Sequence, residues 1–330
     1  MLLLQEAERI GSEAMSKTLE KLKGSRYYGL VLLAAMLVVV YGIFKILTPH
    51  NFGSLNNLSS YLQSSIIYSV GGCGLYFIVV MGLFDFAVGS NVVLSSIVGV
   101  ILSQKFGYIG FVLGCLGCGT LLGLLIGLLY NRLNVPSMIV TVGVMLVFES
   151  VAVIVAGGEK QTLDPAYRFF SGAPGNYILA ILAFLLMYFI LNYTKIGTYC
   201  AAIGSNEFTA KNMGINVKKY KLIGFMLLHF FVGVMAILSV SYGTTMTALT
   251  GMSTMSRNFQ PLMGTFFGVA FRKYGVPITA IVVGEFIISM IFSGFVALGA
   301  PTTIQNVVTG AALLIIVTLT ARGGKGSVVK

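Results

Sequence analysis

The sequence has 330 residues, of which 57% are hydrophobic and 9% are charged, and its mean hydropathy is +0.93. Soluble domains are about 45–50% apolar, so this composition excludes a soluble globular protein and predicts an all-α integral membrane protein. The net charge of +11 does not indicate a nucleic-acid partner. The lysines and arginines collect in short loops between apolar runs, as membrane topology requires.

Apolar runs predict about ten transmembrane helices, some of them broken, within a membrane domain of residues 29–321. The runs are 29–47, 62–84, 92–102, 108–130, 136–156, 177–193, 222–242, 261–271, 276–298 and 304–320. Residues 1–28 precede them and mix charged residues with leucines at near-helical spacing, which predicts a cytoplasmic amphipathic helix on the membrane surface. Early acidic residues argue against a secretory signal. Residues 322–330 are expected to form a cytoplasmic tail.

Two of the predicted helices are expected to be interrupted. Asp85 follows the second apolar run and is itself followed by Gly89 and Ser90. An ionisable residue with glycine and serine beside it indicates a broken helix that faces protein or water. Residues 244–258 are polar and irregular, and the run of 261–271 after them is too short for a straight crossing.

The glycines of the fourth run recur at intervals of four residues, at 110 and 114 and again at 119, 123 and 127. Small residues at this spacing allow two helix backbones to approach closely. Cys115 and Cys118 lie in the same run, so a packing role is favoured over a redox or metal site. For His229 we favour a hydrogen bond in helix packing, because no second metal ligand is near it in the sequence. We therefore expect no metal in this chain.

Residues 195–221 form the most polar interval between two apolar runs. They contain five lysines and one carboxylate, Glu207, which predicts a cytoplasmic loop and cytoplasmic termini by the positive-inside rule. Within the loop we predict a short helix from Glu207 to Met213, capped by Ser205 or Asn206 and stopped by Gly214 in the left-handed conformation.

The chain lacks the motifs of several enzyme classes. There is no G-x-x-x-x-G-K-S/T loop for ATP, no H-E-x-x-H and no G-x-S-x-G, so the chain is not expected to be an enzyme. Asp85, Glu149 and Glu285 lie in or beside apolar runs. Such carboxylates are ion or proton sites in secondary transporters and channels, which are the alternative class.

Three ordered stretches resemble a known family. Residues 202–217, AIGSNEFTAKNMGINV, resemble the coupling loop A-V-G-G-N-x-x-A-A-x-x-x-G-I-N-V of the ribose-type permeases of ATP-binding cassette importers. Residues 84–90, FDFAVGS, resemble the family's I-D-L-S-V-G-S, and residues 136–143, PSMIVTVG, resemble its P-x-F-I-V-T-L-G. The resemblance covers roughly residues 60–320, and three motifs in order are more specific than one.

The resemblance implies a type II importer-like permease fold in the cell inner or plasma membrane. Such a subunit pairs with a second permease and docks two cytoplasmic ATPase subunits, which bind ATP and Mg, so no cofactor is expected in this chain. It receives a monosaccharide from an extracellular binding protein, with nucleosides or related polyols as alternatives.

The same resemblance suggests which residues carry these roles. The ATPase contact is expected to consist of Gly204, Asn206, Glu207, Lys211, Gly214 and Ile215. Polar side chains expected along the translocation pathway are Asp85, Ser90, Asn91, Gln260 and Asn306.

The chain departs from the family where Glu149-Ser150 replaces the usual Arg-Gly, where Gln260 replaces an acid and where residues 268–271, GVAF, replace G-G-T-S. Glu149 lies about 20 Å along its helix from Pro136, within a hydrocarbon core about 30 Å thick. An unpaired carboxylate there is costly. Glu149 is therefore a candidate subunit-interface residue in a heterodimer whose second permease supplies an arginine. The alternative is a homodimer with Glu149 protonated or facing water.

Overall fold

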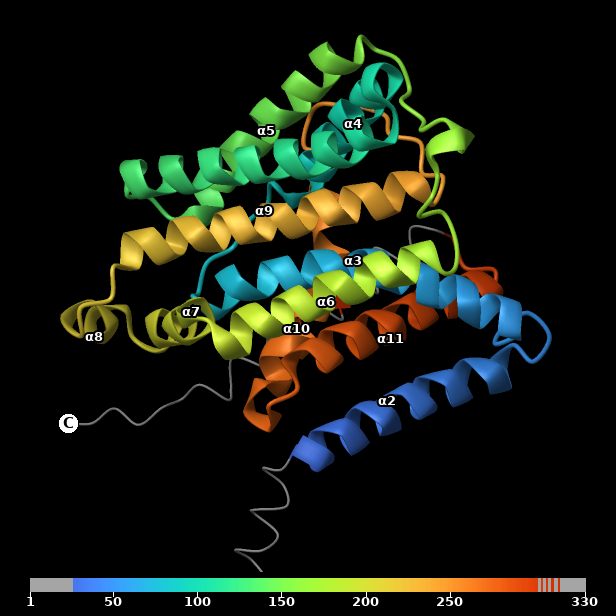
Figure 1. The fold of residues 1–330 in the computed structure, drawn as a ribbon. Coiled ribbons are helices and arrows are strands. Elements are labelled where there is room, and N and C mark those ends of the chain that lie inside the picture. Colours follow the sequence, from blue (N-terminus) through green and yellow to red (C-terminus); the bar gives the residue numbers. More distant parts are fainter. Residues whose placement is uncertain (1–25, 302–303, 305–306, 308–309, 312–313, 315–330) are drawn as a thin grey trace, which may run out of the picture.

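The computed structural model describes residues 26–301 together with 304, 307, 310–311 and 314, and in this part all regular elements are helices (Figure 1). Seven of these are long and apolar enough to cross a membrane: α2 (Arg26–Leu47), α3 (Leu55–Val80), α4 (Val88–Leu133), α5 (Ser137–Ala156), α6 (Gly175–Tyr193), α9 (Val217–Ser241) and α11 (Pro277–Ala297). The shorter helices are η1 (Pro165–Tyr167), α7 (Lys195–Ser205), α8 (Glu207–Asn212), η2 (Met255–Asn258), α10 (Phe259–Ala270) and η3 (Phe271–Tyr274). The all-α membrane architecture is confirmed.

Some predictions concern residues that the structure does not describe. Most of the predicted last span, 304–320, lies outside the described residues, as do the tail of 322–330 and nearly all of the segment 1–28. These three assignments therefore stay predictions.

Helix α4 is a hairpin of two helical halves. Gly107 has φ 61° and ψ −149°, a conformation open essentially to glycine alone, and the chain reverses there. The two halves pack against each other, since a Cβ atom on Gly114 would lie 2.9 Å from the Cα of Gly99. This hairpin accounts for the two separate runs, 92–102 and 108–130, that the sequence predicts.

The centre of the bundle is formed by α3, the second half of α4 and α9. The glycines of α4 allow this packing, since a Cβ atom on Gly123 would lie 2.6 Å from the Cβ of His229 in α9. A Cβ atom on Gly74 of α3 would likewise lie 2.8 Å from the Leu228 carbonyl oxygen. The predicted close approach of backbones is confirmed. Large apolar side chains such as Ile46 and Ile154 are exposed at the periphery, where lipid would cover them.

Both predicted breaks are present. Residues 81–87 join α3 to α4 without helix, and an irregular segment of 242–254 leads to η2 and α10. Helix α10 has 12 residues, about 18 Å at 1.5 Å per residue, so it cannot cross a core about 30 Å thick on its own.

The sequence predicted a loop from Lys195 to Ser205, but these residues form helix α7. Thr194 caps it by accepting a hydrogen bond from Ile196 N, and its buried residues are Gly197, Cys200 and Ile203. Helices α7 and α8 lie together at one end of the bundle, on the left of Figure 1. We call this the α8 end, and we call the opposite end, with Gly107 and the loop of 157–174, the far end.

Candidate functional site

The α8 end carries the segment with the strongest family motif. Asn206 caps α8, its Oδ1 accepting a hydrogen bond from Thr209 N at 2.9 Å, so the second of the two predicted caps is the one used. Gly214 has φ +83° and ends the helix in the left-handed conformation, as predicted. The helix itself ends at Asn212, with Met213 as its C-cap.

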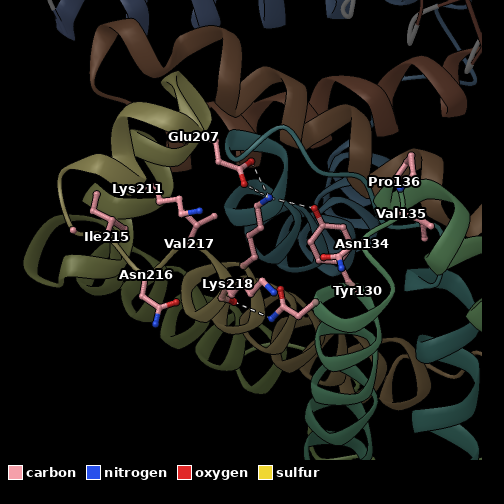
Figure 2. A pocket seen from close by; sticks show the side chains of 13 residues that line it. Tyr130, Asn134, Val135, Pro136, Glu207, Lys211, Ile215, Asn216, Val217 and Lys218 are labelled. Atoms are coloured by element: carbon pink, nitrogen blue, oxygen red, sulfur yellow. Dashed lines mark hydrogen bonds and ion pairs between the residues drawn. The ribbon is translucent and has the colours of Figure 1, made fainter.

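The two faces of α8 differ. Glu207 and Lys211 lie on the face toward the bundle, where they line one pocket with Lys221 (Figure 2). Lys221 Nζ lies 2.9 and 3.0 Å from the Glu207 carboxylate oxygens and donates to Tyr130 Oη at 3.3 Å. On the opposite face, Phe208 is 73% exposed and Met213 is 76% exposed. Two large apolar side chains, one on α8 and one at its C-cap, are therefore exposed on the side away from the pocket.

Helix α7 fastens this segment to the transmembrane helices. A Cβ atom on Gly204 would overlap the carbonyl oxygen of Val80, the last residue of α3. The rings of Tyr199 and Tyr220 meet edge to face with centroids 4.7 Å apart, which joins α7 to α9. Cys200 is buried, and burial raises the pKa of its thiol to about 12, so it packs as a small apolar group. Any movement of α7 would therefore act on Val80, which directly precedes the break of 81–87.

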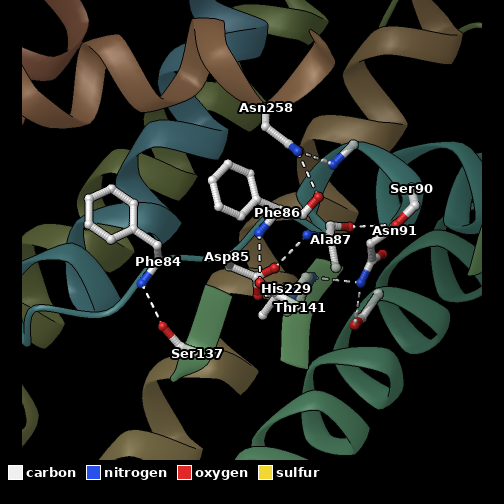
Figure 3. Close-up of polar contacts among 12 residues, drawn as sticks. Phe84, Asp85, Phe86, Ala87, Ser90, Asn91, Ser137, Thr141, His229 and Asn258 are labelled. Atoms are coloured by element: carbon white, nitrogen blue, oxygen red, sulfur yellow. Dashed lines mark hydrogen bonds and ion pairs between the residues drawn. The ribbon is translucent and has the colours of Figure 1, made fainter. Parts of the chain in front are cut away.

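A hydrogen-bonded network fills the first break (Figure 3). Asp85 Oδ1 accepts from Ala87 N at 2.6 Å, and Oδ2 lies 2.9 Å from His229 Nε2. The Asn91 amide nitrogen lies 3.3 Å from the Gly119 carbonyl and 2.7 Å from His229 Nδ1, so it donates to both. The ring proton is therefore on Nε2 and is donated to Asp85. The packing role expected for His229 is confirmed.

Helix α5 supplies hydroxyl groups to the same break. Phe84 N donates to Ser137 Oγ at 3.0 Å, and Phe86 N donates to Thr141 Oγ1 at 3.1 Å. Backbone groups freed by a break in a membrane helix need such partners. The motifs of 84–90 and 136–143, which are far apart in the sequence, are thus in direct contact.

Asn258 joins the second break to the first. Its Oδ1 accepts from Gly89 N at 2.5 Å, and its Nδ2 donates to Phe86 O at 2.6 Å. The residue is buried and lies at the end of η2. Sequence reasoning missed Ser137, Thr141 and Asn258, because only the folded chain brings them to the Asp85 segment.

The heterodimer prediction assumed that the Glu149 carboxylate has no partner in its own chain, and the structure shows that it has partners there. Its side chain is 1% exposed, and Oε2 accepts from Met252 N at 2.9 Å. Oε1 accepts from Thr254 N at 2.8 Å and from Thr254 Oγ1 at 2.6 Å. The carboxylate is therefore neither unpaired nor at a free surface, because the irregular segment of 242–254 returns into the bundle. The sequence alone did not reveal this return.

The remaining predicted site residues are only partly brought together. Asp85, Ser90 and Asn91 are neighbours and are buried, whereas Gln260 lies half-buried on α10. Asn306 lies outside the described residues. Glu285 is buried elsewhere, with Oε1 accepting from Gly264 N at 3.0 Å. Among the described residues no group of three potential metal ligands occurs.

Replacing Asp85 with Asn should destabilise the chain. The new amide nitrogen would face either Ala87 N or His229 Nε2, both of which are donors, and an unmatched buried donor costs about 1–3 kcal/mol. We expect a lower midpoint of thermal unfolding in detergent. Asp164→Asn is the control. Asp164 Oδ1 accepts a hydrogen bond from Ala166 N at 2.8 Å, in the same way as Asp85 Oδ1 accepts from Ala87 N, but Asp164 is exposed. Equal midpoints for Asp85→Asn and wild type would contradict the assigned contacts.

A bundle of apolar helices, with two breaks joined at its centre and a short helix outside one end, defines a polytopic membrane protein. Residues 57–317 match the family described as branched-chain amino acid transport system / permease component, and the chain belongs to this family.

Its relatives include three permeases. The chain is 24% identical over 318 residues to the ribose import permease protein RbsC of Escherichia coli strain K12, covering 91% of this chain and 98% of the relative. It is 26% identical over 305 residues to the D-allose transport system permease protein AlsC of the same strain, covering 88% and 90%. It is 35% identical over 117 residues to the xylose/arabinose import permease protein XylH of Sulfolobus acidocaldarius, covering 34% and 33%. No solved structure matches.

The predicted permease class and the resemblance to ribose-type permeases are thereby confirmed. The alternative, a proton- or ion-coupled transporter or channel, gains no support from the relatives.

Proposed function

We propose that this chain is the translocation subunit of an ATP-driven importer of a monosaccharide. The observation that carries the proposal is α8, a capped helix outside the bundle whose free face exposes Phe208 and Met213. Exposed large apolar side chains at the tip of a short helix suit a cleft in a partner protein. The partner is a cytoplasmic ATPase, which would bind the ATP and Mg that this chain has no motif to hold.

The orientation follows from the same segment. Lys195, Lys211, Lys218, Lys219 and Lys221 cluster at the α8 end, so this end is proposed to be cytoplasmic, with both termini on that side. An extracellular binding protein would then deliver the solute to the far end. Movement of the ATPase would shift α8 and α7 together, and the contact of Gly204 with Val80 would pass the shift to the Asp85 break.

A monosaccharide is the proposed solute because of the relatives' names. The family description mentions branched-chain amino acids, whereas the three relatives are named for ribose, D-allose and xylose/arabinose. Pentoses and hexoses are uncharged and rich in hydroxyl groups, which suits polar side chains such as Ser90, Asn91 and Gln260 along a pathway. Nucleosides or related polyols are the second choice.

The second permease subunit is proposed to be another copy of this chain. The contacts of Glu149 with Met252 and Thr254 support a homodimer, because they remove the need for an arginine from a different permease. Each copy would present one α8 to one ATPase subunit. The mass of the complex that this chain forms with the ATPase alone distinguishes the two assemblies.

The test of the proposed function is Phe208→Ala. Loss of a buried aromatic anchor at a protein interface costs about 2 kcal/mol or more, which corresponds to at least about 30-fold weaker binding. We expect the variant to insert normally and to lose the ATPase during copurification. The measurement is the dissociation constant of purified ATPase from the chain in nanodiscs.

Phe106→Ala is the matched control, because Phe106 is also an exposed phenylalanine, at 67%, but lies beside Gly107 at the far end. Its ATPase affinity should equal that of wild type. Wild-type affinity in Phe208→Ala would contradict the assignment of the free face of α8 as the ATPase contact.

A further inference from the structure

A hollow at the α8 end lies behind α8 and is not lined by Phe208 or Met213. It has a volume of about 830 Å³ and is bounded by the end of α4, the start of α5, the segment from Glu207 to Asn216, which we call the coupling segment, and the start of α9 (Figure 2). Its lining residues are Tyr130, Asn131, Asn134, Val135, Pro136, Glu207, Lys211, Gly214, Ile215, Asn216, Val217, Lys218 and Lys221. Glu207, Lys211, Gly214 and Ile215, which the resemblance assigns to the ATPase contact, line this pocket, whereas Phe208 and Met213 do not.

The pocket is positively charged. It contains three lysines and one glutamate, which gives a formal charge of +2. The carboxylate of Glu207 is neutralised by Lys221 at 2.9 Å. Within the described part of the chain, neither Lys211 nor Lys218 forms an ion pair. Their two ammonium groups are therefore available to an anion.

The pocket lies where a lipid headgroup would be. Three transmembrane helices, α4, α5 and α9, end or begin at its wall, which places it at the boundary between the apolar core and water. Beside it, Leu133, Met138 and Ile139 expose apolar side chains that lipid chains would cover. Val135 and Pro136 line the pocket on this side.

We propose that the pocket binds the phosphate headgroup of an anionic phospholipid of the cytoplasmic leaflet. Basic pockets between transmembrane helices on the cytoplasmic side suit such headgroups. The phosphate would accept charge-assisted hydrogen bonds from Lys211 and Lys218, while the acyl chains lie along α5. Because Lys211 belongs to α8 and Lys218 to α9, the bound lipid would tie the coupling segment to the transmembrane bundle.

The experiment titrates the purified full chain, in detergent and without ATPase, with fluorescent phosphatidylglycerol. In the double variant Lys211→Gln/Lys218→Gln the dissociation constant should rise about 30-fold, the effect of two lysines near an anionic headgroup. The variant Lys211→Arg/Lys218→Arg keeps both charges and should bind within a few-fold of wild type. The readout involves no ATPase, so it is independent of the proposed function.

Lys195→Gln/Lys219→Gln is the matched control, because both lysines are exposed at the same end and neither lines the pocket. Its affinity should be unchanged, and phosphatidylcholine should bind wild type much more weakly than phosphatidylglycerol. Equal weakening in the control, or equal binding of phosphatidylcholine, would overturn the proposal. Displacement of the fluorescent lipid by millimolar inorganic phosphate would indicate a soluble phosphate ligand instead. Displacement of the lipid by added ATPase would assign the pocket to the ATPase interface. Either result would overturn the lipid site.

Discussion

Replacing Gly204 with Ala should strongly reduce coupled transport while membrane insertion stays normal. The added Cβ would overlap the carbonyl oxygen of Val80, and a backbone atom cannot move aside without shifting α3 or α7. Overpacking of this kind costs about 1–3 kcal/mol. That range corresponds to a loss of about 5- to 150-fold in the population of correctly docked α7. Sugar uptake in proteoliposomes should fall accordingly, whereas ATPase binding through Phe208 should persist.

The control for Gly204→Ala is Gly117→Ala. Gly117 lies in a transmembrane helix, is exposed, and has no atom near the position of an added Cβ. Alanine there should leave uptake unchanged, since Ala is the better helix former. Uptake and solute-stimulated ATP hydrolysis are measured together for both variants. Wild-type coupling in Gly204→Ala would show that the contact of α7 with α3 does not transmit the movement.

The contact at Gly204 matters because the three family motifs meet around one break. The coupling motif contacts Val80 through Gly204, and the motif of 136–143 holds the motif of 84–90 through Ser137 and Thr141. Motifs that are separate in the sequence thus form one connected unit from the α8 end to the centre of the bundle. This arrangement gives a physical reason for their joint occurrence in one chain.

Local features of this fold could be predicted from the sequence. Spans follow from length and hydropathy, so α5 begins at Ser137 and ends at Ala156 as its apolar run indicates. The cap at Asn206 and the stop at Gly214 depend only on neighbouring backbone groups. Helix α7 had a comparable signal, since Gly197, Cys200 and Ile203 recur at three-residue spacing, but the polarity of the loop obscured it.

The contacts at the centre could not be predicted, because they join residues far apart in the chain. Asn258 and Phe86 are separated by 172 positions, and Glu149 and Thr254 by 105. A charge inside an apolar run signals a constraint but not its partner. For Glu149 the sequence suggested a missing arginine from another subunit, whereas the partners are backbone N–H groups of the same chain.

Replacing Glu149 with Ala should release the segment of 242–254 from the bundle. The part-buried N–H of Met252 and the buried N–H of Thr254 would lose a charged acceptor, and the buried donor alone costs about 1–3 kcal/mol when left without a partner. Met252 has φ +64°, an uncommon conformation for a residue with a side chain, and Glu149 is the contact that holds it. Amide hydrogen exchange should therefore accelerate about 30-fold or more at Met252 and Thr254.

Two further variants, measured in the isolated chain, distinguish contacts within the chain from contacts with a second subunit. Glu149→Gln keeps one acceptor oxygen for Thr254 but opposes Met252 N with an amide, so its exchange should be intermediate. Ser150→Ala changes the exposed neighbour on α5 and should leave exchange unchanged. The measurement uses this chain without ATPase or any second permease. If Glu149 acted only through an arginine of another subunit, Glu149→Ala would alter exchange only after pairing. Because its partners are Met252 and Thr254 of the same chain, we expect the full effect in the isolated chain.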